Sequence, residues 1–398
     1  MIGAGLARRE PPFPVPFAAR TATDGPRIVR RRWRAAIVES RGRFAAVRIA
    51  LEIAAGALAL ALALWAHVSF WTRRFRLPPT GETLHVRTAD GWRLALARRR
   101  STGAPRRRTP VLLVHGIAAN HACMDFGMGR LSLAAHLAEA GFEAFSVDLR
   151  GHGGSARTRG LPHNWTFDDY LRFDLPAAVD AIREATGAPA VAVVGHSQGA
   201  LLALAAAGTL DDRVAGVVAL AGPAHFGAQR GLALLARAGF LVTGRLNRLA
   251  ARALSPYAGW WHPHVSQAVW NANNVDGAVY RRVLVNVVEN VPPGVLRQFG
   301  GWIQMDQWMS GDGTVDYRGA LAQARQPAFF LGGADDVLAP PEVVRAAYEA
   351  WGGERSMWIA GQQGGCGCEY GHSDLLFGRQ APDEIFPRVR DWLITHVG

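Results

Sequence analysis

Residues 190–207 read AVAVVGHSQGALLALAAA, with a serine between two glycines at the junction of two segments of different composition. Residues 190–194 form a short valine-rich run without alternation, which is typical of a strand buried on both faces of a sheet. Residues 200–207 are all alanine or leucine, which have high helix propensities. The pattern therefore predicts a strand, a sharp turn at Ser197 and a helix, in that order.

The serine at this turn is a candidate nucleophile. A sharp strand-to-helix turn exposes the hydroxyl at the positive end of the helix. The flanking Gly195 and Gly199 lack the side chains that would clash at such a turn. The pattern G-x-S-x-G also occurs by chance, and an ordinary turn of an α/β domain can contain the same residues. The rest of the chain must therefore supply a base, an acid and oxyanion donors.

Apolar runs separated by helical stretches continue on both sides of this turn. Strands that alternate with helices of this length predict an α/β protein with a mainly parallel, doubly wound sheet. A hairpin around Asp90-Gly91 precedes the parallel part. The predicted strands are 84–87, 93–97, 110–114, 142–147, 190–194, 214–220, 328–331 and 357–359, and the predicted helices are 126–140, 173–185, 200–207 and 383–397.

The sheet pattern is interrupted between residues 222 and 318, a stretch rich in Trp, Val, Leu and Asn. About a hundred residues between two strands are too many for a plain loop. We expect a helical cap at 222–318, over the carboxyl edge of the sheet where open α/β sheets bind ligands. The core then comprises residues 84–221 and 319–398. The alternative is an extra subdomain that makes no contact with substrate.

The first 72 residues differ from the rest. Residues 1–52 form a basic tail rich in proline and arginine, and residues 1 to about 43 have the composition of a loosely ordered segment. Residues 53–72 contain no Asp, Glu, Lys or Arg, and twenty such residues suit a transmembrane helix. Membrane-surface binding and packing on the globular domain are the alternatives for this helix. We expect a single-pass, membrane-anchored protein whose catalytic motifs all follow residue 84, so that residues 1 to about 76 are dispensable for activity.

Charge does not indicate the orientation of that helix or a polymeric partner. The twenty residues before Ile53 and the twenty after Thr72 each contain four arginines, so the positive-inside rule favours neither orientation. The 398-residue chain has a net charge of +12, but all 44 of its basic residues are arginine, which indicates a genome-wide composition bias. Its arginine clusters contain no nucleic-acid-binding motif, and no nucleic-acid partner is expected.

The three cysteines, Cys123, Cys366 and Cys368, are too few for a disulfide framework. Cys366-Gly-Cys368 lacks a second pair of metal ligands, so a glycine-rich loop is the preferred interpretation. We expect neither a metal nor an organic cofactor.

A base and an acid follow the last strands. His372 lies in the segment CEYGHSDLLFG, after the last predicted strand, which places it at the carboxyl edge level with Ser197. Asp335 and Asp336 directly follow the run 328–331. A nucleophilic serine needs a base, and that base needs a carboxylate to orient it. Taken alone, each of these residues would fit an exposed loop or a helix cap.

Two backbone groups are candidate oxyanion donors. The run VLLVHGIAANH ends a buried strand in His115-Gly116-Ile117, and the glycine turn lets the N–H of Ile117 point at the serine. The N–H of Gln198, at a helix N-terminus, is the second donor. Losing one such donor typically costs about 3 kcal/mol of transition-state stabilisation. His115 precedes the glycine and is expected to be structural.

Five motifs occur in an order that resembles the α/β-hydrolase fold superfamily: HGI, SVDLRGHGGS, GHSQG, GGADDVLAPP and YGHSDLLFG. The chain is most similar to the acid lipases of the gastric and lysosomal type, on the Gln of GHSQG and on the last motif. NVPPGVLRQFGGW resembles polyhydroxyalkanoate synthases, which have cysteine at the nucleophile position. The resemblance implies a triad of Ser197, Asp336 and His372. Asp336 fits the superfamily spacing from Gly333 and to Pro340, whereas the acid-lipase spacing leaves Asp335 as the alternative.

This resemblance implies a serine hydrolase that cleaves carboxylic esters, either lipidic or otherwise apolar. An acyltransferase would use the same residues, with an alcohol or thiol in place of water. A third reading, from another class, is a non-catalytic membrane protein on a hydrolase fold. Hydrolysis is preferred because serine stands at the nucleophile position.

Overall fold

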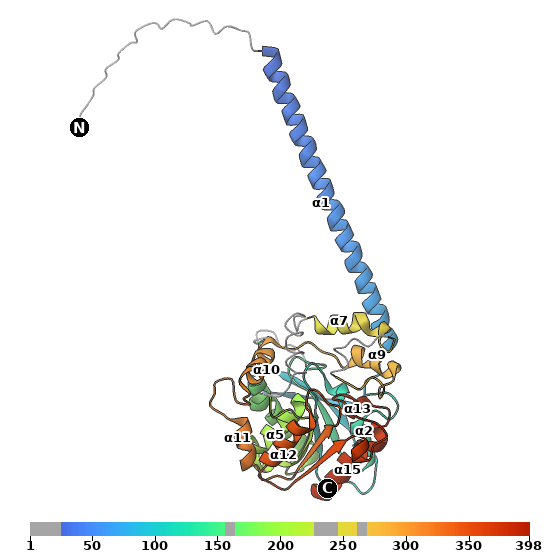
Figure 1. Ribbon diagram of the computed structural model, residues 1–398, viewed down its shortest axis with the longest axis vertical. Coiled ribbons are helices and arrows are strands. Elements are labelled where there is room, and N and C mark those ends of the chain that lie inside the picture. Colours follow the sequence, from blue (N-terminus) through green and yellow to red (C-terminus); the bar gives the residue numbers. More distant parts are fainter. Residues whose placement is uncertain (1–24, 156–163, 227–245, 261–268) are drawn as a thin grey trace, which may run out of the picture. The chain divides into compact units, whose positions relative to one another are not determined.

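The computed structural model describes residues 25–155, 164–226, 246–260 and 269–398 (Figure 1). The chain divides into two compact units, Met1–Trp65 and Ala66–Gly398. The second unit contains the sheet and every predicted site residue.

The sheet has eight strands in the order β1-β2-β4-β3-β5-β6-β7-β8. β1 pairs with β2 and β2 with β4 in antiparallel fashion, and all other neighbours are parallel. The prediction of a mainly parallel sheet is therefore confirmed. The strands are β1 Glu82–Arg87, β2 Arg93–Arg99, β3 Val111–Val114, β4 Ala144–Asp148, β5 Val191–His196, β6 Val214–Leu220, β7 Ala328–Gly333 and β8 Arg355–Ala360.

The central strands lie in the core. Every residue of β3, β4, β5 and β7 is buried, and most of these residues are apolar, which is typical of parallel strands covered on both faces. In the register, Val114 at the end of β3 pairs with Gly195 of β5, and Gly333 at the end of β7 pairs with Ala360 of β8. The carboxyl ends of these strands thus form one edge, at which the predicted site residues follow.

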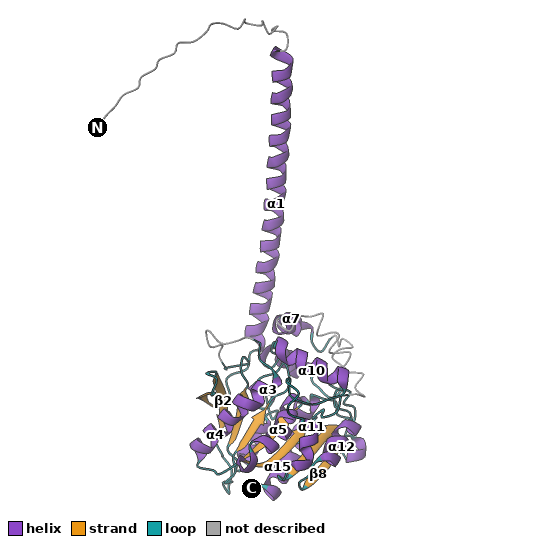
Figure 2. Ribbon diagram, turned by 90° about the vertical axis from the view of Figure 1, so that its left-hand side faces the viewer, coloured by secondary structure: helices purple, strands orange, loops and turns teal. Residues whose placement is uncertain are grey.

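Helices cover both faces of the sheet (Figure 2). α2 and α15 pack together on one face, whereas α4, α5 and α12 pack on the other. The bounds of these helices are α2 Leu133–Glu139, α4 Leu175–Thr186, α5 Gln198–Thr209, α12 Pro341–Ala350 and α15 Phe386–His396.

Two helices differ from their predicted limits. The helix expected at 126–140 begins at Leu133, because the hydroxyl of Ser132 accepts a hydrogen bond from the N–H of Ala135 and caps it there. The helix expected at 173–185 is preceded by helical turns that begin at Phe167, after a capping box between Thr166 and Asp169. In both cases an N-terminal cap, and not the periodicity of the apolar residues, determines where the helical segment begins.

The insertion between β6 and β7 is helical in its described part, with α7 Asn247–Leu254, α9 Gly277–Asn286, α10 Pro293–Met305 and α11 Tyr317–Ala320. Residues 227–245 and 261–268 of the predicted cap lie outside the described residues. Trp302 of α10 packs against Phe167 and Phe226, with ring centroids 5.0 and 5.6 Å apart. The insertion therefore shares the core of the sheet unit.

Helix α1 spans Gly25–Phe75, so the part of the predicted tail from residue 25 onward is helical. Glu39 with Arg43 and Arg48 with Glu52 form ion pairs one turn apart, which favour a helix in this basic segment. By length and composition, Arg30–Phe75 is apolar enough to cross a membrane, with a mean hydropathy of 2.1 in its most apolar window. Residues 1–24 of the tail lie outside the described residues.

Candidate active site

Ser197 lies between β5 and α5 at the predicted turn. Its backbone has φ 58° and ψ −118°, a region that residues other than glycine rarely adopt. Such a conformation costs about 1–3 kcal/mol and is typical of functional sites. The Ser197 N–H donates to the carbonyl of Leu220 at 2.8 Å, which ties the turn to β6. The side chain is thereby held at the carboxyl edge of the sheet.

The two glycines of the turn are required by close backbone contacts. A Cβ at Gly195 would lie 2.0 Å from the carbonyl oxygen of Gly199. A Cβ at Gly199 would lie 2.1 Å from the carbonyl oxygen of Val114 at the end of β3. Neither position has room for a side chain, because α5 begins directly against the ends of two strands.

His372 and Asp336 are in direct contact. The Nδ1 of His372 lies 2.8 Å from Oδ2 of Asp336, and both side chains are buried. The other carboxylate oxygen accepts hydrogen bonds from the N–H groups of Leu338 and Ala339, at 2.8 and 2.9 Å. A carboxylate held in this way accepts a hydrogen bond from Nδ1–H, so the free Nε2 of His372 is the basic nitrogen.

Asp335 is placed differently from its neighbour. Its side chain is exposed, and its backbone N–H donates to the carbonyl of Tyr370 at 2.9 Å. Asp336, by contrast, is 3% exposed and faces His372. Of the two carboxylates that sequence spacing left open, the geometry favours Asp336.

His196 joins the serine turn to the loop of the base. Its Nε2–H donates to the backbone carbonyl of His372 at 2.9 Å, and the two imidazole centroids lie 4.8 Å apart. Burial lowers the pKa of His196 to about 3, so the ring is neutral near pH 7. Within the described residues no hydrogen bond joins Ser197 to Nε2 of His372, and in free enzymes this bond is often long. Sequence reasoning assigned His196 no role, although it directly precedes the serine.

Both predicted oxyanion donors border the serine. A Cβ at Gly116 would lie 3.1 Å from Cβ of Ser197, so the Gly116-Ile117 turn faces Ser197. Gln198 is the first residue of α5, where a backbone N–H has no partner inside the helix. Neither the N–H of Ile117 nor that of Gln198 donates to another described residue. Two donors are thus available beside Ser197.

His115, expected to be structural, is fully buried and used within the fold. Its Nδ1–H donates to the carbonyl of Gly116 at 2.8 Å, and its Nε2 accepts from the N–H of Leu149 at 3.2 Å. Burial lowers its pKa to about 3. The neutral ring therefore stabilises the start of the oxyanion turn.

Metal-ligating side chains do not cluster in the part of the chain that the structure describes: it contains no group of three His, Cys, Asp or Glu suited to a metal ion. Cys366 is buried, and burial raises the pKa of its thiol to about 11. The pKa of Cys368 is also raised by burial. Neither thiol is a reactive thiolate near neutral pH.

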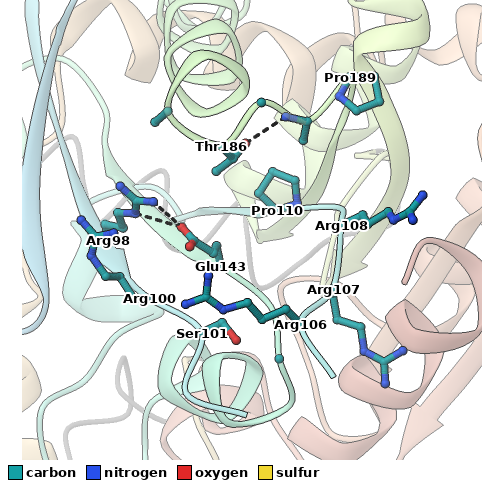
Figure 3. A pocket seen from close by; sticks show the side chains of 14 residues that line it. Arg98, Arg100, Ser101, Arg106, Arg107, Arg108, Pro110, Glu143, Thr186 and Pro189 are labelled. Carbon is teal, nitrogen blue, oxygen red and sulfur yellow. Dashed lines mark hydrogen bonds and ion pairs between the residues drawn. The ribbon is translucent and has the colours of Figure 1, made fainter. Parts of the chain in front are cut away.

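A cavity of about 490 Å³ opens at the other edge of the sheet (Figure 3). Its lining includes Pro110, which directly precedes β3, and Pro189, which lies two residues before β5, so the cavity lies at the amino ends of these strands. Arg98 points into it and is paired with Glu143 through two hydrogen bonds of 2.6 and 2.9 Å. This cavity is separated from Ser197 by the length of β5 and takes no part in the candidate site.

Comparisons with known proteins agree with the α/β fold described above. Residues 109–267 match the protein family described as alpha/beta hydrolase fold. Human lipase member K is 32% identical over 152 residues, which are 36% of this chain and 37% of that lipase. Human lysosomal acid lipase/cholesteryl ester hydrolase is 34% identical over 131 residues, 30% of this chain and 33% of that protein.

Solved structures extend the match over more of the chain. A thermophilic esterase from Thermogutta terrifontis is 19% identical with a TM-score of 0.55, and the match covers 80% of this chain and 100% of the esterase. The two curated lipases, in contrast, are matched over about a third of their own length.

Proposed function

We propose that this chain, which has the α/β-hydrolase fold and resembles acid lipases over about a third of its length, hydrolyses carboxylic esters. One observation supports this proposal above the others. A serine on a strained turn stands at the same sheet edge as a buried His–Asp pair whose carboxylate is fully hydrogen-bonded. These are the parts of a Ser-His-Asp triad, which is recognised by geometry and roles.

In this mechanism the hydroxyl oxygen of Ser197 attacks the ester carbonyl, and Nε2 of His372 takes the hydroxyl proton. The imidazolium then gives that proton to the leaving alcohol, and an acyl-enzyme remains on Ser197. Water, deprotonated by the same nitrogen, releases the acid. Asp336 holds the Nδ1–H tautomer and stabilises the imidazolium, which is the orienting role of a triad carboxylate.

The tetrahedral intermediate has a negative oxygen that requires donors in place before the reaction. The N–H groups of Ile117 and Gln198 border Ser197 and donate to no other described residue. Such preorganised donors are worth more in a partly buried site than in water. We assign them to the oxyanion hole.

The substrate class follows from the resemblance to lipases and from helix α1. We propose apolar or lipidic esters as substrates, with the helix containing residues 53–72 as a single-pass membrane anchor. An anchor of this kind keeps the enzyme at the surface where such esters are concentrated.

The proposal is tested by replacing the nucleophile. Ser197→Ala should remove hydrolysis of p-nitrophenyl butyrate and labelling by a fluorophosphonate probe, because loss of a triad nucleophile can cost about a millionfold in turnover. Ser101→Ala, at the opposite edge of the sheet, is the matched control and should leave both unchanged. Substantial hydrolysis by the folded Ser197→Ala protein would refute the proposal.

A further inference from the structure

The last turns of helix α1 belong to the sheet unit. Residues 66–75 fall within the unit Ala66–Gly398, and Phe75 is buried. His67 contacts the insertion, with Nε2 3.0 Å from the carbonyl oxygen of Ala253 and its ring stacked on Tyr257. This end of the helix is therefore attached to the insertion as well as to the chain that follows it.

Asn286, the last residue of α9, binds the backbone at the end of α1. Its Oδ1 accepts from the N–H of Leu77 at 2.9 Å, and its Nδ2 donates to the carbonyl of Phe75 at 3.0 Å. The same Nδ2 donates to the carbonyl of Arg282 within α9, at 2.7 Å. The side-chain amide of Asn286 thus binds the carbonyl of Phe75 and the N–H of Leu77, and so links the end of α1 to the insertion.

The backbone of Asn286 in turn binds the loop after Gly116. Its carbonyl accepts from Nδ2 of Asn120 at 2.9 Å, and this Nδ2 also reaches Oε1 of Glu289 at 3.0 Å. The N–H of Glu289 donates to the carbonyl of Ala118 at 2.8 Å. Asn120 and Ala118 are therefore both held by the last residue of α9 and the segment that follows it.

The residue directly before these attachments is the proposed oxyanion donor. Ile117 lies between Gly116, which faces Ser197, and Ala118, whose φ of 56° is unusual for a residue with a side chain. A non-glycine residue keeps such a φ only when its surroundings impose it. The hydrogen bond from Glu289 to Ala118 is an interaction that can do so.

We propose that Asn286 is a positioning residue, through which the C-terminal end of helix α1 holds the oxyanion donor Ile117 in place. This inference rests on the proposed ester hydrolysis. The chain of contacts runs from Phe75 and Leu77 through Asn286 to Asn120, and thus to the loop of Ile117. No member of it other than Ile117 touches the reacting atoms. This chain of contacts acts by positioning the N–H of Ile117. A misplacement of about 1 Å in a catalytic group can lower the rate roughly a hundredfold.

The test uses the full chain in detergent micelles with p-nitrophenyl butyrate. Asn286→Ala should lower kcat by about tenfold to a hundredfold and leave KM within about twofold, because an oxyanion donor acts mainly in the transition state. Asn273→Ala is the matched control, since Asn273 is exposed in the same insertion and its side chain bonds to no other described residue. It should retain the wild-type kcat. A urea midpoint shows that each variant is folded.

A second variant keeps the test decisive if Asn286→Ala does not fold. Asn286→Asp retains an acceptor for Leu77 and removes the donor to Phe75, and it should also lower kcat selectively. In a double-mutant cycle, Asn120→Ala should add little to the loss from Asn286→Ala, because the two residues act along one path.

The outcomes separate this inference from the proposed function. A wild-type chain without ester turnover rejects both. An active wild type with an unchanged kcat in Asn286→Ala or Asn286→Asp rejects the positioning role alone. A rise in KM without a fall in kcat, or fully additive losses with Asn120→Ala, would also overturn it.

Discussion

The carboxylate of Asp336 accepts hydrogen bonds from His372 and from two backbone N–H groups, whereas the side chain of Asp335 is exposed. These neighbours have the same chemistry and differ only in the direction in which the loop after β7 turns them. In the proposed mechanism, the buried carboxylate holds the tautomer of the base and stabilises its charged form.

This difference predicts unequal effects of two identical substitutions. Asp336→Asn should lower kcat for p-nitrophenyl butyrate by roughly ten-thousandfold, because the amide no longer fixes the productive tautomer of His372. Asp335→Asn should change kcat by at most about tenfold and serves as the matched control. The opposite ranking would assign the acid to Asp335, and small effects from both would show that neither carboxylate serves His372.

At the residue scale, local motifs were sufficient to find the groups that we propose act directly on the substrate. Ser197 and His372 follow strands in recognisable segments, so the sequence placed them at one edge. His196 and Asn286 were missed for a physical reason. Their contacts join segments 176 and 209 residues apart in the chain, and a single sequence does not show which distant backbone groups meet. Asp335 and Asp336 could not be separated on residue type, since only the fold of the loop distinguishes them.

Among the elements, helix α1 differs most from its expected form. The apolar run 53–72 predicted a spanning helix after a loosely ordered tail, but α1 begins at Gly25 and its last turns pack on the insertion. Arginine and alanine favour a helix even where the composition is basic, and ion pairs one turn apart add to this preference. The apolar run 53–72 indicated a helix long enough to span a membrane. The contacts of residues 66–77 could not be predicted in the same way, because they depend on how the insertion folds.

These contacts change the expected result of truncation. Removal of residues 1–65 should release the protein from membranes, because the remaining apolar residues 66–72 span only about 10 Å of a hydrocarbon core of about 30 Å. Its kcat should stay within about threefold of the full chain. Removal of residues 1–76 should also release the protein but lower kcat at least about tenfold, since the Phe75 carbonyl that Asn286 binds is gone.

Membrane pelleting and p-nitrophenyl butyrate kinetics of both truncations check this prediction. If the chain lacking residues 1–65 still pellets with membranes, another surface binds the bilayer. Equal activity of the two truncations would show that residues 66–76 contribute nothing to the site, in agreement with the simpler expectation from motif positions.

For the whole molecule, the sheet separates two environments. The carboxyl ends of β3, β5 and β7 bring together the loop of Ile117, the turn of Ser197 and the loop of Asp336. The amino ends of β3 and β5 border an arginine-lined cavity instead. The mainly parallel direction of the strands could be predicted from the alternation of strands and helices. The contacts within the insertion could not, because its sequence has no periodicity that specifies how its helices dock.

The central claim is that ester cleavage passes through an acyl-enzyme on Ser197, and rapid acid quenching of p-nitrophenyl acetate turnover tests it most directly. Cleavage after arginine releases residues 184–213, a peptide in which Ser197 is the single serine. Mass spectrometry should find one acetyl group on that peptide, at Ser197, during the first turnover, and none in Ser197→Ala. Turnover without acetylation of this peptide, or with the acetyl group on another residue, would contradict the account.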